Sequence, residues 1–337
     1  MAESKLVGKE YTSYFSTDGA IVETRTHIPP LGPRDVLIRI THSGVCYADA
    51  LYASKGATLS LGHEGVGIVE AVGSQVTTLA PGDRAGGGFH RHSCGNCRYC
   101  LSGRDIYCSQ RVIFGSGDTD NGTFSQYYIG KETYVHRIPD TLASEHAAPL
   151  QCAGATVYNA LKNTIRLGIR IGIVGIGGLG HLAIQFAAHL SAGVVALSTT
   201  PSKEEEARQF GASEFALLGD VKMETPLDVV VITSSSYPDW DKLMDPRVLA
   251  RDGVVVPLTA SSRPLILPAG TMLSQGYHIH SSLVASRGNH DEMLDFAARH
   301  GIRPAVQVFK NIGAASIQYV IDELMANRIR YRVILEI

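Results

Sequence analysis

The chain has 337 residues, which is long for a single hydrophobic core and favours two domains. Hydrophobic residues make up 45% and charged residues 18%, and 30 basic against 32 acidic residues leave a net charge of −2. This is an ordinary globular balance, without the basic excess that nucleic acid or an anionic membrane surface would require. Met1–Glu10 carries charges and no apolar core, and the apolar stretch Ile171–Leu190 is broken by glycines and a histidine. We therefore expect no secretory signal and no membrane span, and a cytoplasmic location.

The first third of the chain predicts strands and turns. Asp35–Ile40 and Gly65–Val72 alternate or run apolar and are bounded by glycine and proline. Pro81, Gly82 and Asp83 form a turn signal before another short strand. This pattern favours an antiparallel, β-rich domain with long loops.

The pattern changes near Pro149, where helical and strand segments begin to alternate. Ala153–Leu161 is helical in composition, Ile171–Val174 is a short β-branched strand, and Gly177–Leu190 has apolar residues at helical spacing. The alternation continues with a strand, a helix and two buried-type strands, at Gly193–Ser198, Ser202–Phe210, Leu227–Thr233 and Gly253–Leu258. Strands that alternate with helices predict a parallel, doubly wound sheet. From about Ser286 the chain returns to mixed character, and we expect it to rejoin the first domain.

A glycine-rich turn follows the strand Ile171–Val174, with Gly175, Gly177 and Gly180 in the spacing Gly-x-Gly-x-x-Gly. These glycines allow a tight turn and a close approach of the backbone to a pyrophosphate. The helix that follows points its N-terminal amides at the phosphates. Because the turn lies between a strand and a helix, we predict a dinucleotide site that also includes Gly178 and Leu179; a glycine turn without a ligand is the alternative.

The end of the next strand bears on the choice between NAD(H) and NADP(H). An NAD site usually offers a carboxylate there, which binds the ribose 2′-hydroxyl. This chain has no carboxylate at that point and instead offers Ser198, Thr199, Thr200 and Lys203, whose hydroxyls and ammonium suit a 2′-phosphate. The sequence therefore favours NADP(H), with the alternative that Lys203 is only the first exposed charge of a helix.

Four of the six cysteines lie close together in the chain, at Cys94, Cys97, Cys100 and Cys108. Four thiolates with no open position describe a closed, tetrahedral structural zinc site. Two disulfides are one alternative. An iron–sulfur cluster is another alternative. Bacterial cluster motifs, however, usually have three residues between the third and the last cysteine and follow the last with proline, whereas here seven residues separate Cys100 from Cys108. A nucleic-acid-binding zinc ribbon is disfavoured, because ribbons separate two cysteine pairs by a longer insert.

Cys46, His63, Glu64 and Cys152 form a second set of metal-ligand types, but their spacing alone does not join them. A lone histidine or cysteine is more often part of the buried structure than a ligand. If joined, they offer two thiolates, an imidazole and a fourth position. That is the open arrangement of a catalytic zinc, which polarises a carbonyl or acidifies a bound water.

On these residues the chain resembles the zinc-containing medium-chain alcohol dehydrogenases, in particular their cinnamyl alcohol dehydrogenase-like branch. The matching segments run in family order: Ser43–Asp49, Gly62–Gly65, the four-cysteine lobe, Pro149–Tyr158, the glycine turn and Arg330–Arg332. The resemblance implies a GroES-like catalytic domain over residues 1–153 and 286–337, with the structural zinc lobe at about 90–110. It implies a Rossmann NADP(H)-binding domain over residues 154–285, with the active site between the domains.

The resemblance also implies roles for single residues. Cys46, His63 and Cys152 would hold the catalytic zinc, and Glu64 would be a nearby carboxylate that can approach the metal during ligand exchange. Asp49 would accept a hydrogen bond from His63 and fix its tautomer, with an ordinary loop acid as the alternative.

Two further residues are assigned to the cofactor on the same basis. Thr156 would lie near the nicotinamide, and Arg332 near the pyrophosphate, unless Arg332 is simply a solvated strand end. The expected ligands are therefore NADP(H) and two zinc ions per chain, one catalytic and one structural. Family members are commonly dimers or tetramers built through the Rossmann sheet, and we expect a homodimer.

The chain departs from the family at the proton relay. Family alcohol dehydrogenases have Ser or Thr two residues after the catalytic cysteine, often followed by His three residues later. Here these positions are Ala48 and Leu51, which cannot pass on a proton, and position 47, commonly His or Arg, is Tyr47. Reducing a carbonyl requires a hydride at carbon and a proton at oxygen, so the usual proton route is missing.

Three functions follow from the resemblance and this departure. The first is a zinc-dependent NADP(H) oxidoreductase that interconverts an aldehyde or ketone and an alcohol, with water, Tyr47 or Tyr52 as the proton source. The second is a relay-free reductase of an imine, iminium or conjugated C=C bond in secondary metabolism, because some plant alkaloid reductases of this branch also lack the relay. The third, a non-catalytic cofactor-binding relative, is disfavoured by the complete zinc and glycine motifs.

The resemblance places four residues in the substrate pocket, Tyr47, Ala48, Leu51 and Phe89, each of which could equally serve packing. The small Ala48 and the apolar Leu51 would widen and dry the pocket, which favours a bulky, apolar small molecule. The link Asn163–Arg170 before the nucleotide strand is shorter than in the family and lacks its Pro-Gly turn. This difference bears on the domain hinge.

Overall fold

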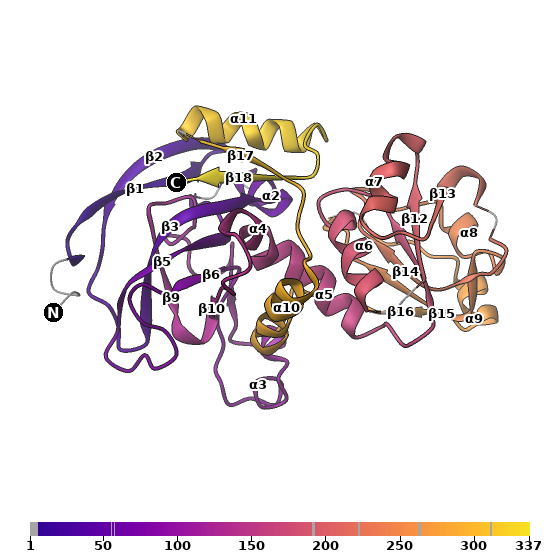
Figure 1. The fold of residues 1–337 in the computed structure, drawn as a ribbon, viewed down its shortest axis with the longest axis horizontal. Coiled ribbons are helices and arrows are strands. Elements are labelled where there is room, and N and C mark those ends of the chain that lie inside the picture. Colours follow the sequence, from indigo (N-terminus) through magenta and orange to yellow (C-terminus); the bar gives the residue numbers. More distant parts are fainter. Residues whose placement is uncertain are drawn as a thin grey trace. The chain divides into compact units, whose positions relative to one another are not determined.

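The computed structural model describes residues 6–54, 56, 58–190, 193–221, 223–261, 264–310 and 312–337. Residues 1–5 lie outside these ranges. They are half of the segment Met1–Glu10, in which we expect no secretory signal. The chain divides into two compact units, the first being Met1–Cys152, Ala285–Arg299 and Pro304–Ile337, and the second Ala153–Val284 and His300–Arg303 (Figure 1). Within the described ranges no helix is long and apolar enough to cross a membrane.

The first unit is built around one large sheet, in the order β10-β6-β5-β3-β18-β17, with β9 also pairing with β3. Its strands are β3 (Asp35–Val45), β5 (Glu64–Val72), β6 (Arg84–Gly88), β9 (Tyr127–Lys131), β10 (Val135–Arg137), β17 (Val306–Phe309) and β18 (Arg332–Glu336). The central strand β3 is buried at Val36, Leu37 and Ile38, so that both of its faces are covered. The C-terminal β18 pairs antiparallel with β3, and the end of the chain thereby completes the sheet that its first third begins.

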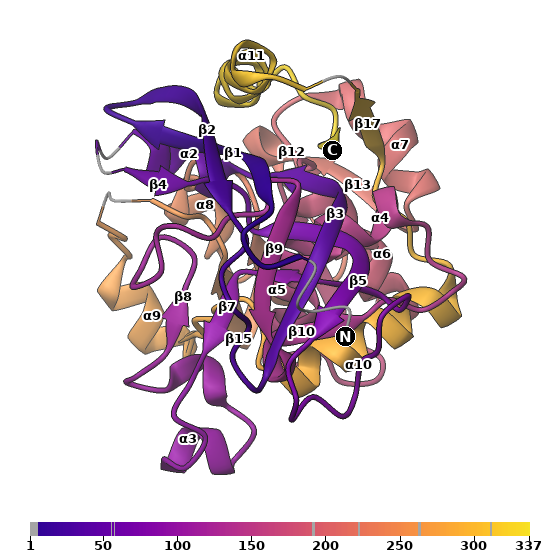
Figure 2. The same cartoon turned by 90° about the vertical axis from the view of Figure 1, so that its left-hand side faces the viewer.

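Smaller elements surround this sheet. A three-stranded sheet has the order β2-β1-β4, and β7 pairs with β8, with bounds β1 (Glu10–Thr17), β2 (Ala20–His27), β4 (Leu59–Ser60), β7 (His90–His92) and β8 (Val112–Ile113). The α-helices are α2 (Tyr47–Ala53), α3 (Arg98–Leu101), α4 (Ser144–Pro149), α10 (Arg287–His300) and α11 (Ala314–Met325). Short helical turns are η1 (Asp105–Tyr107), η2 (Glu132–Tyr134) and the π-helical η3 (Leu150–Gly154). The lobe that carries α3 lies at the opposite end of this unit from α11 in both views (Figure 2).

The second unit contains a six-stranded parallel sheet in the order β13-β12-β11-β14-β15-β16. Its strands are β11 (Arg170–Val174), β12 (Gly193–Ser198), β13 (Glu214–Leu217), β14 (Leu227–Ile232), β15 (Leu249–Pro257) and β16 (His278–Ile279). Its helices are α5 (Ala155–Lys162), α6 (Gly180–His189), α7 (Glu204–Gln209), α8 (Trp240–Leu243) and α9 (Ala269–Gln275), with the 3-10 turns η4 (Pro201–Lys203) and η5 (Leu218–Asp220). The strand order reverses direction between β11 and β14, which is the point where doubly wound sheets bind ligands.

The predicted parallel, doubly wound sheet and β-rich first third are confirmed, with shifted element ends. The helix expected from Gly177 begins at Gly180, because the glycine turn occupies the residues before it. The helix expected from Ser202 is preceded by the 3-10 turn Pro201–Lys203 and starts at Glu204. Strand β3 continues five residues beyond its predicted end and stops at Val45, so that Cys46 is the first residue after the strand.

Candidate metal centres and nucleotide turn

The structure brings together the four scattered ligand-type residues Cys46, His63, Glu64 and Cys152. One ligand atom from each lies within 4.8 Å of the others. Cys46 follows β3 directly, His63 and Glu64 stand at the start of β5, and Cys152 lies in η3. Because β3 and β5 pair antiparallel, the end of one strand lies beside the start of the other. The sheet register therefore explains the meeting of residues that the spacing alone did not join.

His63 is fully buried and held in one orientation. Its Nδ1 atom lies 3.0 Å from Asp49 Oδ1, and its ring stacks on Phe114 with centroids 4.3 Å apart. Its Nε2 atom is buried and has no hydrogen-bond partner among the described residues. A buried nitrogen without a partner costs about 1–3 kcal/mol, and a metal ion bound at Nε2 would remove that cost. The residues present therefore fit a bound metal ion.

Asp49 connects the two segments that carry Cys46 and His63. It is fully buried; its Oδ2 accepts the Cys46 N–H at 2.9 Å, and its Oδ1 accepts the Gly62 N–H at 3.1 Å as well as the His63 ring. Burial lowers the pKa of His63, but the charge and hydrogen bond of Asp49, assisted by Cys46, outweigh burial and raise it to about 10. The arrangement thus concentrates negative charge around the imidazole, which favours a cation at this point.

Glu64 and Arg332 form a buried ion pair beside these ligands. Burial raises the pKa of Glu64 to about 8, although the Arg332 guanidinium opposes this shift. The hydrogen bond with Cys152 lowers the pKa of Cys46 well below its usual range, with His63 and Arg332 acting in the same direction. The hydrogen bond with Cys46, together with burial, raises the pKa of Cys152. A thiol and a thiolate that share one proton in this way would become two thiolates when a divalent cation displaces that proton.

The four-cysteine lobe also gathers its sulfur atoms at one point. Neighbouring Sγ atoms lie 3.5 to 3.9 Å apart, and all four cysteines are free of disulfides. Four sulfurs placed about 2.3 Å from a zinc ion form a tetrahedron with edges of about 3.8 Å. The N–H groups of Cys94 and Gln110 point at Cys108 Sγ, at 3.5 and 3.3 Å, and lower the pKa of its thiol, but burial and the neighbouring sulfurs of Cys94 and Cys100 outweigh them and raise that pKa. This lobe therefore fits a closed tetrahedral zinc site.

The glycine turn has the shape that a dinucleotide site needs. Gly175 has φ +89°, and a side chain on it would come within 2.8 Å of Ser234. A side chain on Gly180 would meet the Gly175 carbonyl oxygen, whereas Gly177 has open space around its Cα. These properties match the three glycine roles of the motif, namely the tight turn, the approach to pyrophosphate and close helix packing. Leu179 is the N-cap of α6, and Gly178 precedes it in the turn.

Lys203 reaches back to this turn, and its Nζ atom donates to the Ile176 carbonyl at 2.7 Å. Ser198 ends β12, its Oγ atom accepts the Thr200 N–H at 3.3 Å, and Thr199 stands between them. The polar groups expected to contact the cofactor thus gather at the carboxyl end of β12. Thr156 lies in the first turn of α5, whereas the Arg332 guanidinium lies at Glu64. The contact of either residue with a cofactor stays a prediction.

Of the residues expected to line a substrate pocket, Tyr47, Ala48 and Leu51 lie on α2, and Tyr47 is 41% exposed. Phe89 is buried, with its ring edge-on to His63 at 5.8 Å between centroids. Sequence analysis missed Phe114, which is fully buried, stacks on His63 and donates its N–H to the Phe89 carbonyl at 2.8 Å. A single aromatic residue in a loop gives no periodic signal, and only the pairing of β7 with β8 places it here.

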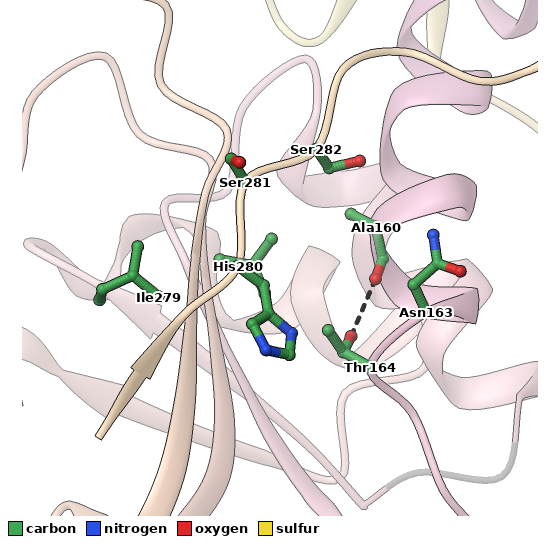
Figure 3. Close-up of a pocket in the computed structure, with 8 residues that line it drawn as sticks. Ala160, Asn163, Thr164, Ile279, His280, Ser281 and Ser282 are labelled. Carbon is green, nitrogen blue, oxygen red and sulfur yellow. Dashed lines mark hydrogen bonds between the residues drawn. The ribbon is translucent and has the colours of Figure 1, made fainter. Parts of the chain in front are cut away.

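A cavity of about 400 Å³ lies in the second unit, beside the ends of α5, β15 and β16 (Figure 3). The Thr164 hydroxyl at its edge donates to the Ala160 carbonyl at 2.9 Å. Polar and apolar side chains both line it, namely Ala160, Asn163, Thr164, Val256, Ile279, His280, Ser281 and Ser282. None of the residues that the sequence assigned to metal, cofactor or substrate lines this cavity.

Comparison with known proteins gives matches over most of the chain. Residues 32–140 match the family model of the alcohol dehydrogenase GroES-like domain, and residues 178–299 match that of the zinc-binding dehydrogenases. A probable formaldehyde dehydrogenase of Bacillus subtilis is 38% identical over 323 residues, which are 91% of each chain. The NADP-dependent alcohol dehydrogenase C 1 of Mycolicibacterium smegmatis is 31% identical, over 96% of this chain and 97% of the relative. A solved structure of a cinnamyl alcohol dehydrogenase from Sorghum bicolor superposes with a TM-score of 0.89 at 30% identity, covering 97% of this chain and 98% of the other.

Proposed function

The chain belongs to the zinc-containing medium-chain alcohol dehydrogenase family, in its cinnamyl alcohol dehydrogenase-like branch, and we propose that it transfers hydride between NADP(H) and an aldehyde or ketone, or the corresponding alcohol. It is thus an oxidoreductase that acts on a small molecule. The observation that carries the proposal is the buried His63 Nε2 atom, which has no partner among the described residues, in a cluster where one ligand atom each of His63, Cys46 and Cys152 lies within 4.8 Å of the others. When bound there, zinc polarises the substrate oxygen and stabilises the negative charge on it.

The residues around this site have separate tasks in the proposed reaction. Cys46, His63 and Cys152 hold the catalytic ion, and Asp49 keeps the imidazole in the tautomer that leaves Nε2 free. Glu64 is the nearby carboxylate, and its pairing with Arg332 keeps a buried charge compensated. Phe89 and Phe114 cover His63 with apolar rings and exclude water from that side.

The cofactor is assigned to the second unit, as a Rossmann domain over residues 154–285, with the catalytic domain over 1–153 and 286–337. The turn Gly175–Gly180, with Gly178 and Leu179, would bind the pyrophosphate, and Ser198, Thr199, Thr200 and Lys203 the 2′-phosphate. Thr156 is assigned to the nicotinamide and Arg332 to the pyrophosphate by family resemblance. NADP(H) is supported by the lack of a carboxylate at the end of β12, and the Mycolicibacterium relative is named NADP-dependent.

The second zinc ion is assigned to the four-cysteine lobe, which makes two ions per chain. The assembly would be a homodimer, for which the short strand β16 offers an edge, since it pairs only with β15 in the part of the chain that the structure describes. The compartment would be the cytoplasm.

A second candidate function follows from Ala48 and Leu51, which replace the usual proton relay on α2. Reduction of an imine, iminium or conjugated C=C bond in secondary metabolism needs no proton at a metal-polarised oxygen. For carbonyl reduction, the proton would come from water, from the exposed Tyr47 or from Tyr52, whose ring lies edge-on to Phe114 at 5.3 Å. The relatives named as aldehyde and alcohol dehydrogenases support the carbonyl reaction as the first candidate.

Product analysis distinguishes the two functions. NADPH oxidation by the zinc-loaded protein would be measured with bulky and small aldehydes, conjugated enals and cyclic imines, and with NADH as the matched control. Conversion of aldehydes to alcohols would support the first function, and turnover confined to C=N or conjugated C=C bonds would support the second. In the double variant Ala48→Thr and Leu51→His, aldehyde reduction should rise by about 10- to 100-fold if proton delivery limits it. No rise would show that the missing relay does not limit that reaction.

A further inference from the structure

A chain of polar side chains leads from the surface of the first unit to the residue before Cys152. Gln151 is 1% exposed and lies in the π-helical turn η3. Its Nε2 atom donates to the Ala147 carbonyl of α4 at 3.0 Å, and its Oε1 atom accepts from His290 Nε2 of α10 at 3.1 Å. The amide satisfies both partners in one orientation only, because the carbonyl of Ala147 accepts and the ring nitrogen must then donate.

The His290 ring is fixed from its other side. It stacks face to face on His136 of β10, with centroids 3.8 Å apart and planes 6° apart, and α10 lies beside β10 in both views (Figures 1 and 2). His136 Nδ1 lies 2.6 Å from Asp291 Oδ1, and the Asp291 side chain is 63% exposed. Helix α10 thus contacts His136 through His290 and Asp291, and His290 also forms a hydrogen bond with Gln151.

The surroundings of Gln151 show why these hydrogen bonds matter. Its neighbours Leu150, Ala153, Ala147 and Ala148 are fully buried apolar residues. An amide in such a place is costly to bury unless both of its polar atoms are paired. A side chain on Gly86 would come within 3.0 Å of Gln151 Cδ, so that Gly86 leaves the space for this amide. The glutamine is therefore accommodated, and an apolar side chain in its place would leave the buried His290 ring nitrogen without this partner.

The π-helical turn needs such support. π-helical turns are rare, occur mostly as single turns and are frequent at functional sites. Pro149 is the last residue of the preceding helix α4, and because it has no backbone N–H it cannot donate a hydrogen bond within that helix. The residues of η3 are buried, and the hydrogen bonds of Gln151 add directional constraints to this apolar packing. The conformation of η3 in turn sets where Cys152 Sγ points.

We propose that Gln151 and His290 are positioning residues that hold Cys152 at the metal centre, with His136 and Asp291 orienting the His290 ring. This inference rests on the proposed function, because it takes Cys152 as a zinc ligand. The side chains act on the conformation of η3 and not on the reacting atoms, since His290 hydrogen-bonds to Gln151, the residue before Cys152.

The test measures zinc release from the Cys46–His63–Cys152 site against release from the four-cysteine lobe, so that a local effect is separated from a general loss of stability. Wild type and the variants Gln151→Leu and His290→Phe would be loaded with zinc and mixed with a coloured chelator. Release from the Cys46–His63–Cys152 site would then be resolved from release by the four-cysteine lobe. We expect release from the first site to accelerate about tenfold, at the lower end of the range for groups that support metal ligands, with the lobe unchanged. Cobalt-substituted protein should show a shifted thiolate charge-transfer band.

Two further variants make the test specific. His290→Gln keeps a donor for Gln151 and should release zinc at close to the wild-type rate. If Gln151→Leu does not fold, His290→Phe, which removes that donor, is compared with His290→Gln instead. Gln185→Leu removes a buried glutamine of the second unit that bonds both to the Arg303 N–H, at 3.1 Å, and to its carbonyl, at 2.9 Å. It should leave zinc release unchanged.

The outcomes separate the two proposals. If wild type takes up only one zinc ion, held by the four cysteines, the proposed catalytic site itself is wrong. If wild type holds two ions and Gln151→Leu and His290→Phe release them at the wild-type rate, the positioning role is overturned while the proposed function stands. Equal acceleration by Gln185→Leu would also overturn the positioning role, because it would show a general loss of stability.

Discussion

Replacing Asp49 by asparagine removes one acceptor from the residue that joins Cys46 to His63. The carboxylate accepts three hydrogen bonds, from the Cys46 N–H, the Gly62 N–H and the His63 ring. An asparagine has one acceptor oxygen, so its NH₂ group must replace either Oδ2 and face the Cys46 N–H, or Oδ1 and face the Gly62 N–H and the His63 ring. At least one hydrogen bond is lost in either orientation. Losing one hydrogen bond to a charged group costs about 1.5–3 kcal/mol. Expressed in metal affinity, this corresponds to about 10- to 150-fold weaker zinc binding.

Proton competition works against this loss but does not cancel it. Asp49 contributes to the raised pKa of His63, about 10, so the asparagine variant also makes it easier for zinc to displace a proton. A divalent ion carries twice the charge of a proton and therefore loses more attraction when the carboxylate is neutralised. Zinc affinity should therefore fall in Asp49→Asn.

The assay is equilibrium competition with a chelator, in which the four-cysteine lobe of the same protein serves as the internal reference. Glu132→Gln is the matched control, because Glu132 is also buried in the first unit and accepts the N–H groups of Thr77 and Thr78. Among the described residues, it belongs to neither of the two groups of candidate metal ligands. A zinc affinity of Asp49→Asn within twofold of wild type, or an equal loss in Glu132→Gln, would refute the role given to Asp49.

Two other predictions concern stability and cofactor choice. Burial lowers the pKa of His90 to about 4, so the unfolded chain binds more protons between pH 6.5 and 4. The free energy of unfolding should therefore fall as the pH drops through this window, by up to ~3 kcal/mol, and His90→Phe should flatten this dependence in denaturant titrations. Lys203→Ala should weaken NADPH binding about tenfold in fluorescence titrations and leave NADH binding unchanged, because of the two cofactors only NADPH has a 2′-phosphate that the ammonium could bind. Equal losses for both cofactors would assign Lys203 to the turn alone, through Ile176.

The features that the sequence predicted best are those whose physical cause is local. The cysteines of the lobe are close enough in the chain that short turns bring Cys94 and Cys108 to 3.5 Å between sulfurs. The glycine turn is likewise specified by the strand before it and the helix after it. The set Cys46, His63 and Cys152 needed the antiparallel register of β3 and β5 and the turn η3, neither of which leaves a spacing in the sequence.

The contact of Gln151 with His290 spans 139 residues and depends on the return of the chain from the second unit to the first. Sequence periodicity reports which face of a helix or strand is buried, and it gives no sign of such a return. The long connection itself is tolerated, because the entropic cost of closing a loop grows only slowly with its length. A trace of the contact is nevertheless present in the sequence. Gln151 interrupts the apolar run from Ala147 to Ala153, and a buried amide in such a run requires partners on both of its polar atoms. The run therefore implies that a donor lies opposite Gln151, and the return of the chain to the first unit at α10 supplies His290 as that donor.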